Sequence, residues 1–406
     1  MHVVATPAEP VAGRISPARI ALVVAATHGL NDAYASFVPP LLPRIMGDLG
    51  LSIALAATLS VAFSVASALP QPLFGYLSDR YGRRPFAVLG PIVSGVFIAS
   101  IGLAGSFGAL VVLLIVAGIG SAAFHPPGAS YAVRLSEGKG GGARYSLFSF
   151  GGAVGFALGP LVAVGLVQWR GMEGLWIAML PVLALAPLVY LGLPSGRREV
   201  ISGAARPPAP GAVLRQLRGP LGLLFAVSAT MAFVQRAFLT MEPIIVAEAG
   251  GSEALGAIVL SVYLFAQAFG TVAGGLLADR VDRGMLLVQL CFWSLPAHAA
   301  AVWLAPGTGL WLAAAACAGF FGMATLPPIV VMAQEMLPSG TAVNSGIVMG
   351  LAWGVGALGV LVTGRFADAV GPQAATLASL PVLLVAVALA ARPALRGRTA
   401  FERAGV

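Results

Sequence analysis

Apolar blocks follow one another along almost the whole chain, and each is long enough to cross a membrane. A hydrocarbon core of about 30 Å needs a helix of roughly 20 residues, and the 406 residues contain twelve such blocks. Hydrophobic residues make up 58% of the chain and charged residues only 9%, whereas soluble domains carry about a quarter charged residues. Backbone polar groups in hydrocarbon must be paired within the segment, so the blocks predict an all-α integral membrane protein with twelve transmembrane helices. The blocks lie at approximately 20–43, 52–77, 86–106, 109–134, 144–168, 173–193, 220–247, 254–278, 285–304, 309–336, 342–368 and 373–391.

The basic residues lie almost entirely in the breaks on one side of the predicted helices. If both termini lie on that side, the opposite side holds only Arg44, Arg170 and Arg365. The positive-inside rule then places both termini in the cytoplasm. The first block is too long for the core of a signal peptide, so we keep it as the first transmembrane helix. This placement explains the net charge of +8 without nucleic acid as a partner.

The chain divides into two parts at its longest break. Residues 194–219 are rich in Arg, Pro and Gly and have little apolar periodicity, which is typical of a linker. We therefore predict a six-helix N-terminal half at 20–193 and a six-helix C-terminal half at 220–391. Residues 1–19 and 392–406 are the predicted cytoplasmic tails.

Part of the first half is repeated in the second. The segment "GYLSDRYGRR" at 75–84 aligns with "GLLADRVDRG" at 275–284, and "FHPPGAS" at 124–130 aligns with "TLPPIVV" at 325–331. An even number of helices in each half makes the halves parallel, related by an axis along the membrane normal. That is a transporter arrangement, with the substrate path between the halves near the midplane.

The loop after the second block carries a family resemblance. It contains Gly75, Asp79, Arg80, Gly82 and Arg83, and it looks like the loop signature of the major facilitator superfamily. The segments "HGLNDAYASFVPPLLPRI", "FHPPGAS" and "YSLFSFGGAVGFALGP" together resemble the fosmidomycin resistance protein group of that superfamily. Those proteins usually have an acidic residue after the His-Pro pair, where this chain has Pro127. The resemblance implies a protein of the bacterial inner membrane that moves a small molecule, and the departure at Pro127 leaves the substrate open.

Polar residues form a stripe in the first predicted helix. His28, Asp32 and Ser36 follow one another at intervals of four, so they share one helix face. Asp32 lies roughly 18 Å from the cytoplasmic start of the span at 1.5 Å per residue. An ionisable group at that depth costs at least about 2.5–3.5 kcal/mol, so it should face a cavity or a partner. We predict a proton-coupling site at Asp32 and His28; the alternative is a structural His–Asp pair.

His125 stands before two prolines in the fourth block. It lies roughly 14 Å deep, in the same band as the stripe. Pro126 and Pro127 lack amide donors and should free the carbonyls of Ala122 and Ala123, so we predict a discontinuity in this helix. Histidine titrates near neutrality, so we add His125 to the proton-coupling site; a structural histidine is the alternative.

Two further motifs point to the transport cycle. In the loop at 75–84, Asp79 lies among arginines, and charge-assisted hydrogen bonds there would hold span ends together in one state and release them in another. The resemblance implies the same switching role for this loop. In the fifth block, Gly155 and Gly159 form a small-residue face for close helix packing, followed by Pro160. The resemblance implies a drug–proton antiporter here, because a Gly-x-x-x-Gly-Pro run is typical of such proteins.

Several polar and aromatic residues are candidate walls of a substrate cavity. Arg236 is the only basic residue well inside a span; it would bind an anionic substrate, pair with Asp32, or form a plain ion pair with Glu242. We treat Glu335 and His298 as structural and the segment 137–144 as a flexible loop. The full predicted set of substrate-binding residues is Asn31, Tyr34, Arg236, Phe238, Gln267 and Trp353.

We conclude from the sequence that the chain is a secondary active transporter and not an enzyme. We expect a monomer that exports a small molecule in exchange for protons, without cofactor or metal. The alternatives are a proton-coupled importer, a lipid or metabolite exporter, and a membrane-embedded enzyme using His28, Asp32 and His125 as metal ligands or acid–base groups. No Walker A sequence is present, so ATP is not used directly by this chain.

Overall fold

The computed structural model describes residues 16–135, 141–194, 215, 217–336 and 346–395. All elements among these residues are helical, so the predicted all-α class is confirmed. Eleven segments are long and apolar enough to cross a membrane, and they correspond to predicted spans two to twelve. The predicted tails at 1–19 and 392–406 and the linker at 194–219 lie largely outside the described residues. Of the predicted loop at 137–144, residues 137–140 lie outside them, and residues 141–144 are helical, as the start of a helix at Gly141–Arg170.

The first predicted span forms two helices rather than one. α1 runs over Pro17–Ala35 and α2 over Val38–Leu49. The break falls where Pro39 and Pro40 lack the amide hydrogens that would continue the hydrogen-bond ladder. Ser36 closes α1 by donating from its hydroxyl to the carbonyl of Ala33 at 3.0 Å.

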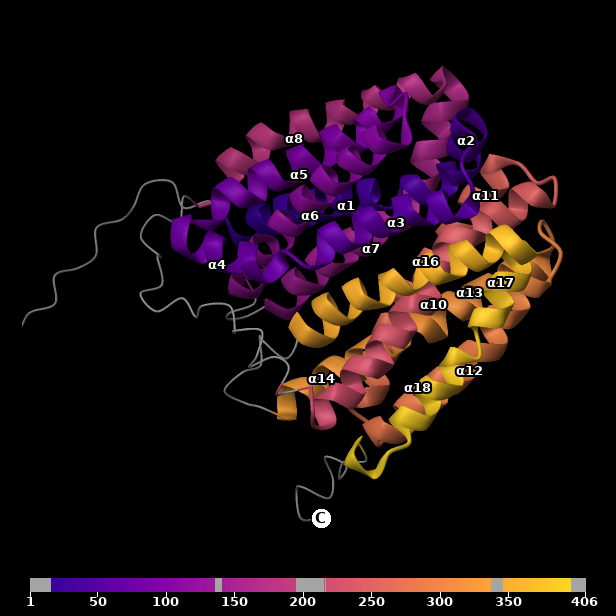
Figure 1. Ribbon diagram of the computed structural model, residues 1–406. Coiled ribbons are helices and arrows are strands. Elements are labelled where there is room, and N and C mark those ends of the chain that lie inside the picture. Colours follow the sequence, from indigo (N-terminus) through magenta and orange to yellow (C-terminus); the bar gives the residue numbers. More distant parts are fainter. Residues whose placement is uncertain (1–15, 136–140, 195–214, 216, 337–345, 396–406) are drawn as a thin grey trace, which may run out of the picture.

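Figure 1 shows the helices in two groups that follow the chain order. The first group, in indigo and magenta, comprises α1, α2, α3 (Ile53–Ala68), α4 (Gln71–Tyr81), α5 (Arg83–Ala99), η1 (Ser100–Leu103), α6 (Phe107–Leu135), α7 (Gly141–Arg170), η2 (Met172–Ala178) and α8 (Met179–Gly192). The second group, from rose to yellow, comprises α10 (Pro220–Glu248), α11 (Glu253–Ala278), α12 (Arg283–Trp303), α13 (Gly309–Ala324), α14 (Leu326–Met336), η4 (Gly346–Leu351), α16 (Ala352–Val370), α17 (Pro372–Ser379), α18 (Val382–Ala390) and η5 (Pro393–Leu395).

The predicted discontinuity at Pro126–Pro127 is wrong, because α6 runs through both prolines as one helix. Membrane helices tolerate proline inside a helix that is packed against its neighbours. The break occurs instead at the corresponding place in the second group. There Thr325 separates α13 from α14, and Pro327 and Pro328 lie in the first turn of α14, where a missing amide costs little.

The repeated residues make the same contacts in each group. A Cβ atom on Gly75 would lie 3.6 Å from Pro126, and one on Gly275 would lie 3.8 Å from Pro327. Likewise, Gly118 of α6 packs on the backbone of Phe63 of α3, and Gly319 of α13 packs on the backbone of Tyr263 of α11. The sequence repeat is therefore also a repeat of helix–helix contacts.

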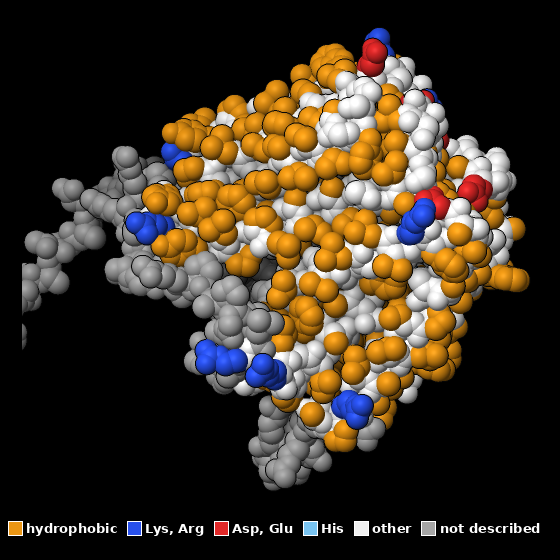
Figure 2. Space-filling model, viewed as in Figure 1, with side chains coloured by type: hydrophobic (Ala, Val, Ile, Leu, Met, Phe, Trp, Pro, Cys, Tyr) orange, Lys and Arg blue, Asp and Glu red, His pale blue; other side chains and the backbone are white. Residues whose placement is uncertain are grey.

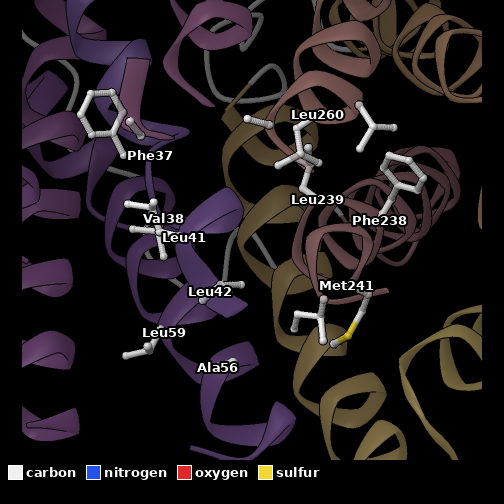
Figure 3. Close-up of a cluster of buried hydrophobic side chains, with 14 of the residues drawn as sticks. Phe37, Val38, Leu41, Leu42, Ala56, Leu59, Phe238, Leu239, Met241 and Leu260 are labelled. Atoms are coloured by element: carbon white, nitrogen blue, oxygen red, sulfur yellow. The ribbon is translucent and has the colours of Figure 1, made fainter. Parts of the chain in front are cut away.

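The two groups are joined tightly at the end where α2 meets α10 and α11. Figure 3 shows apolar side chains of both groups there, among them Leu41 and Leu59 from the first and Leu239 and Met241 from the second. Arg44 donates two hydrogen bonds to Glu253, at 2.7 and 3.1 Å, and this carboxylate raises the pKa of the Arg44 guanidinium. Next to it, Asp368 of α16 accepts a hydrogen bond at 2.8 Å from the first amide of α3.

Charged side chains lie near two ends of the molecule. Figure 2 shows hydrophobic side chains over the broad middle of the visible face, with arginine at one end and both signs of charge at the other. Large exposed apolar residues are found on many of the helices, including Leu22, Val112, Val162, Val272 and Val362. Such an apolar surface is expected where lipid, rather than water, is the solvent.

The predicted small-residue face of α7 packs along α1. Cβ atoms on Gly151, Gly155 and Gly159 would overlap the backbone of Ala25, Gly29 and Ala33, respectively. The two backbones are therefore in direct contact over three turns. Packing explains this face, and its predicted antiporter role stays a prediction.

Substitution Gly155→Ala should destabilise the protein by about 1–3 kcal/mol, because the new methyl group must push α1 away. Gly165→Ala is the matched control on the same helix, where a Cβ atom would meet open space; this change should stabilise α7 by about 0.5–1 kcal/mol through lower backbone entropy. Thermal melting of both variants in detergent, followed by size-exclusion chromatography, measures the difference. Equal melting temperatures would contradict the packing described here.

Candidate functional site

Asp32 lies between two histidines from two helices. Its Oδ2 is 3.1 Å from Nε2 of His28, one turn earlier on α1, and its Oδ1 is 3.3 Å from Nε2 of His125 on α6. The side chains are partly exposed: 12% for His28, 19% for Asp32 and 30% for His125. The structure thus brings together the three residues predicted for proton coupling. We call them the His–Asp–His cluster.

The outer nitrogen of each ring is held by a backbone carbonyl. Nδ1 of His28 lies 2.9 Å from the carbonyl oxygen of Phe148 on α7, and Nδ1 of His125 lies 2.8 Å from that of Ser121. A carbonyl oxygen only accepts hydrogen bonds, so Nδ1 must be the protonated nitrogen in both rings. Each Nε2 then points its lone pair, or a second proton, at the carboxylate.

This geometry sets how many protons the His–Asp–His cluster holds. Each Nε2···O contact is a hydrogen bond only if a proton lies on the nitrogen or on the oxygen. Two protons satisfy both contacts and give the cluster a charge of +1. With one proton the charge is zero and one contact is unpaired, and with none the charge is −1. The cluster can therefore exchange up to two protons.

Neighbouring residues fix the cluster in place. Asn31 is fully buried and donates from Nδ2 to Asp32 at 3.1 Å and to the Ser121 hydroxyl at 3.2 Å. The His28 ring stacks on Phe148 with centroids 4.1 Å apart, and a Cβ atom on Gly152 would overlap that ring. Asn31 thus supports the carboxylate; its predicted part in substrate binding stays a prediction. Sequence reasoning missed Ser121, Phe148 and Gly152 as contributors to this site.

Arg236 of α10 has no hydrogen bond or ion pair with any residue in the described ranges. Its guanidinium lies 5.6 Å from the ring centre of Trp353 on α16. It lines a cavity of about 10 Å³ together with Ser36, Phe156, Pro160 and Leu264, which is room for about one water molecule. The predicted pairings of Arg236 with Asp32 and with Glu242 are both absent.

Other predicted cavity residues are packing residues here. Tyr34 is 1% exposed and donates its hydroxyl to the Ala178 carbonyl at 2.6 Å. Phe238 stacks on Tyr263 with centroids 4.4 Å apart. The amide of Gln267 bonds Gln235 at 2.7 Å. Among the predicted substrate-binding residues, Arg236 lines the small cavity. Trp353 is partly exposed and lies next to Arg236.

Glu242 is also buried, and its partner is Trp311 instead of Arg236, the partner considered from the sequence. The indole nitrogen of Trp311 donates to Oε1 of Glu242 at 2.9 Å. Its other oxygen has no partner among the described residues. Glu242 therefore anchors α10 to α13 rather than neutralising Arg236.

The predicted gating loop forms ion pairs within its own group. Arg83 donates two hydrogen bonds to Asp79, at 3.0 and 2.6 Å, across the turn from α4 to α5. Gly82 has φ of 100° in that turn, a conformation that favours glycine. Arg80 bonds Tyr76 at 2.9 Å. In the second group the corresponding Arg283 pairs instead with Glu335 of α14 at 2.7 Å, so Glu335 is part of an ion pair.

With this geometry in place, comparison with known proteins identifies the family. A model described as "Major Facilitator Superfamily" matches residues 24–346, which is most of the chain. The chain belongs to the Major Facilitator Superfamily. The resemblance seen in the sequence is thus confirmed, and the chain is a membrane transporter by family.

Relatives of this Major Facilitator Superfamily member match it over most of its length. The chain is 28% identical over 359 residues to the "Fosmidomycin resistance protein" of Escherichia coli, covering 85% of each chain. It is 28% identical over 376 residues to the "Uncharacterized MFS-type transporter YfnC" of Bacillus subtilis, covering 90% of each. A bacterial homologue of the human lysosomal transporter Spinster, in an inward-facing, unoccupied conformation, superposes with a TM-score of 0.76 at 18% identity, covering 92% of this chain and 96% of that one.

Nitrogen-15 NMR of histidine-labelled protein in lipid should find Nδ1 of His28 and His125 protonated at every pH, while only Nε2 titrates. His298 is the internal control for this Major Facilitator Superfamily member. Its Nδ1 faces the Ser294 carbonyl at 2.8 Å and its Nε2 faces the Tyr263 hydroxyl at 3.1 Å, and the residue is fully buried, so its signals should not move with pH. A bare Nδ1 with a protonated Nε2 in the neutral rings would contradict the described hydrogen bonds.

Proposed function

We propose that the chain is a proton-coupled secondary transporter that exports a small molecule across a bacterial inner membrane. The observation that carries this proposal is the His–Asp–His cluster, which has room for up to two exchangeable protons on two transmembrane helices. Proton binding changes its charge between −1 and +1, so the pH on each side can drive a conformational cycle. The residues that act are Asp32, His28 and His125.

The proposed cycle is alternating access by two six-helix halves, twelve helices in all. The contacts that support it are the duplicated ones, Gly75 with Pro126 and Gly275 with Pro327. The tight packing around Arg44 and Glu253 would be the closed outer gate. The cluster would then exchange protons with the side that holds both termini, which we propose is the cytoplasm.

Export is supported by the name of the relative from Escherichia coli, a resistance protein, and by the Gly155–Gly159–Pro160 run. Protons would enter from outside and substrate would leave in exchange. The Asp79–Arg83 pair would hold the loop in the present state and open in the other. The working unit would be a monomer, because each chain contains a complete cluster.

One observation favours a second candidate, proton-coupled import of an anion. The unpaired guanidinium of Arg236 is suited to a carboxylate or phosphonate. An anion held there is stabilised when the cluster nearby is protonated, because the net charge is then more positive. Binding of proton and anion would be cooperative, which gives co-transport instead of exchange.

The direction of transport is measured in proteoliposomes. The first probe is fosmidomycin, the compound in the relative's name. Export by exchange predicts that an imposed pH gradient drives the compound against the proton flux. Co-transport predicts movement of both in the same direction. Compounds from a thermal-shift screen of antibiotics, phosphonates and lipids at two pH values serve as further probes.

Substitution Asp32→Asn should abolish proton-driven transport while the protein stays folded. The amide has nearly the same shape but cannot carry the exchangeable proton or the negative charge. Transport in proteoliposomes with and without a pH gradient measures the effect. Glu173→Gln, an exposed carboxylate on η2, is the control and should behave as wild type. A transport rate of Asp32→Asn equal to wild type would refute the proposal.

Substitution Arg236→Gln should weaken binding of anionic compounds by about 10- to 100-fold, the worth of a charged hydrogen bond of about 1.5–3 kcal/mol. Neutral compounds should bind as before. Arg365→Gln is the control, because its side chain is 83% exposed. Thermal shifts with matched anionic and neutral compounds measure both. An equal loss for neutral and anionic compounds would show that Arg236 maintains the fold rather than recognising charge.

A further inference from the structure

We propose that the His–Asp–His cluster is also a binding site for a divalent transition-metal ion, with Zn²⁺ as the best fit. The metal-binding part of this inference stands on the ligand geometry alone. Only its consequence for transport rests on the proposed function. Metal binding would block the proton exchange on which that function depends.

The three ligand atoms already converge. Nε2 of His28, Nε2 of His125 and a carboxylate oxygen of Asp32 all lie within 4.8 Å of one another. In a tetrahedral Zn²⁺ site with bonds of about 2.0–2.1 Å, ligand atoms are about 3.4 Å apart. The short distances end on different oxygens of the carboxylate, 3.1 Å from His28 to Oδ2 and 3.3 Å from His125 to Oδ1. A turn of the carboxylate and a shift of the two rings would bring three ligand atoms to that spacing. Two imidazoles favour zinc, nickel or copper over calcium and magnesium, which prefer oxygen ligands.

The hydrogen bonds around the ligands are those that metal-binding histidines need. A ligating histidine usually donates its other ring N–H to a carbonyl or carboxylate, which fixes the tautomer and aims the lone pair. Here the Phe148 and Ser121 carbonyls do this for His28 and His125, and Asn31 orients Asp32. Three protein ligands leave a fourth position for water, and the partial exposure of His125 gives access to it.

Metal and protons cannot occupy the cluster together. Zinc needs both Nε2 lone pairs and an ionised carboxylate, so binding to the doubly protonated cluster releases two protons. The charge balances, since Zn²⁺ and a cluster of charge +1 give a zinc-bound cluster of charge +1 and two protons. From the second group, the arginine on α10 is Arg236, whose charge is fixed, so it adds no pH dependence. His28 and Asp32 lie on α1, and the third titratable ligand, His125, lies on the neighbouring helix α6.

The test is calorimetric titration of tag-free protein with ZnCl₂ in detergent, at about pH 6.5 and about pH 7.5. All proteins carry Cys317→Ala, because Cys317 is an exposed thiol. We expect one Zn²⁺ per chain, bound about 10- to 100-fold more tightly at the higher pH as one or two protons are displaced. Cobalt absorption in the visible range gives a second readout of a site with nitrogen ligands.

His125→Gln and His28→Gln should each weaken zinc binding by about 100-fold or more, since each removes one of three ligands. Glu173→Gln should bind zinc as the parent protein does. Melting temperature and size-exclusion profile show whether each variant is folded, and the cobalt spectrum of the parent protein tests the site even if a variant does not fold. Unchanged zinc affinity in the folded histidine variants, or a cobalt spectrum without nitrogen ligands, would overturn the inference.

The two proposals fail separately. If Asp32→Asn loses proton-driven transport but zinc does not bind, only the metal site is wrong. If zinc binds at the cluster but Asp32→Asn transports normally, only the proton-coupling function is wrong. If zinc binds at the cluster but does not slow proton-driven transport, the proposed effect on transport is wrong and the metal site still stands.

Discussion

The rest of the site depends on one constraint, the cost of a carboxylate inside the membrane. An ionisable group at the centre of a span costs at least about 2.5–3.5 kcal/mol, and Asp32 meets this cost with three donors from two helices. His28 needs space for its ring, which Gly152 provides on α7. The other glycines of α7 bring that helix against α1, so that the Phe148 carbonyl reaches the ring. The close packing of two helices and the orientation of two histidines thus follow from one buried charge.

The internal repeat separates architecture from chemistry. Contacts present in both groups are formed by glycines and prolines, as in Gly118 with Phe63 and Gly319 with Tyr263. The residues of the His–Asp–His cluster and Arg236 have no such counterparts. Positions 200 or 201 residues later than His28, Asp32 and His125 are Ser228, Ala232 and Leu326, and the position 200 before Arg236 is Ser36. The repeated residues build the scaffold, while the His–Asp–His cluster lies in the first group and Arg236, which has no ion pair within the described ranges, lies in the second.

The amino-acid sequence predicted the cluster because helix geometry is local. The interval of four between His28 and Asp32 fixes their contact, and counting residues from the span ends placed His125 at the same depth. The break in the helix could not be located this way, because proline tolerance depends on neighbouring groups: α6 stays intact at Pro126 while the chain breaks at Thr325. Tyr34 and Phe238 were mistaken for cavity walls, since the sequence does not show which helix face meets another helix. The partners of Arg236 and Glu242 depend on distances between spans, which no local pattern encodes.

The cluster and the closed end lie on one continuous stretch of chain. Asp32 is one helical turn before Ser36, where α1 ends, and α2 then carries Leu41 and Arg44 into the joined end. The break removes the rigid helical connection that would otherwise lock the orientation of α2 to that of α1. Ser36 also lines the cavity that contains Arg236. In the proposed function, a change of charge at Asp32 therefore acts over a short distance. The proton site, the cavity lined by Arg236 and the start of α2 all lie within about two turns of α1.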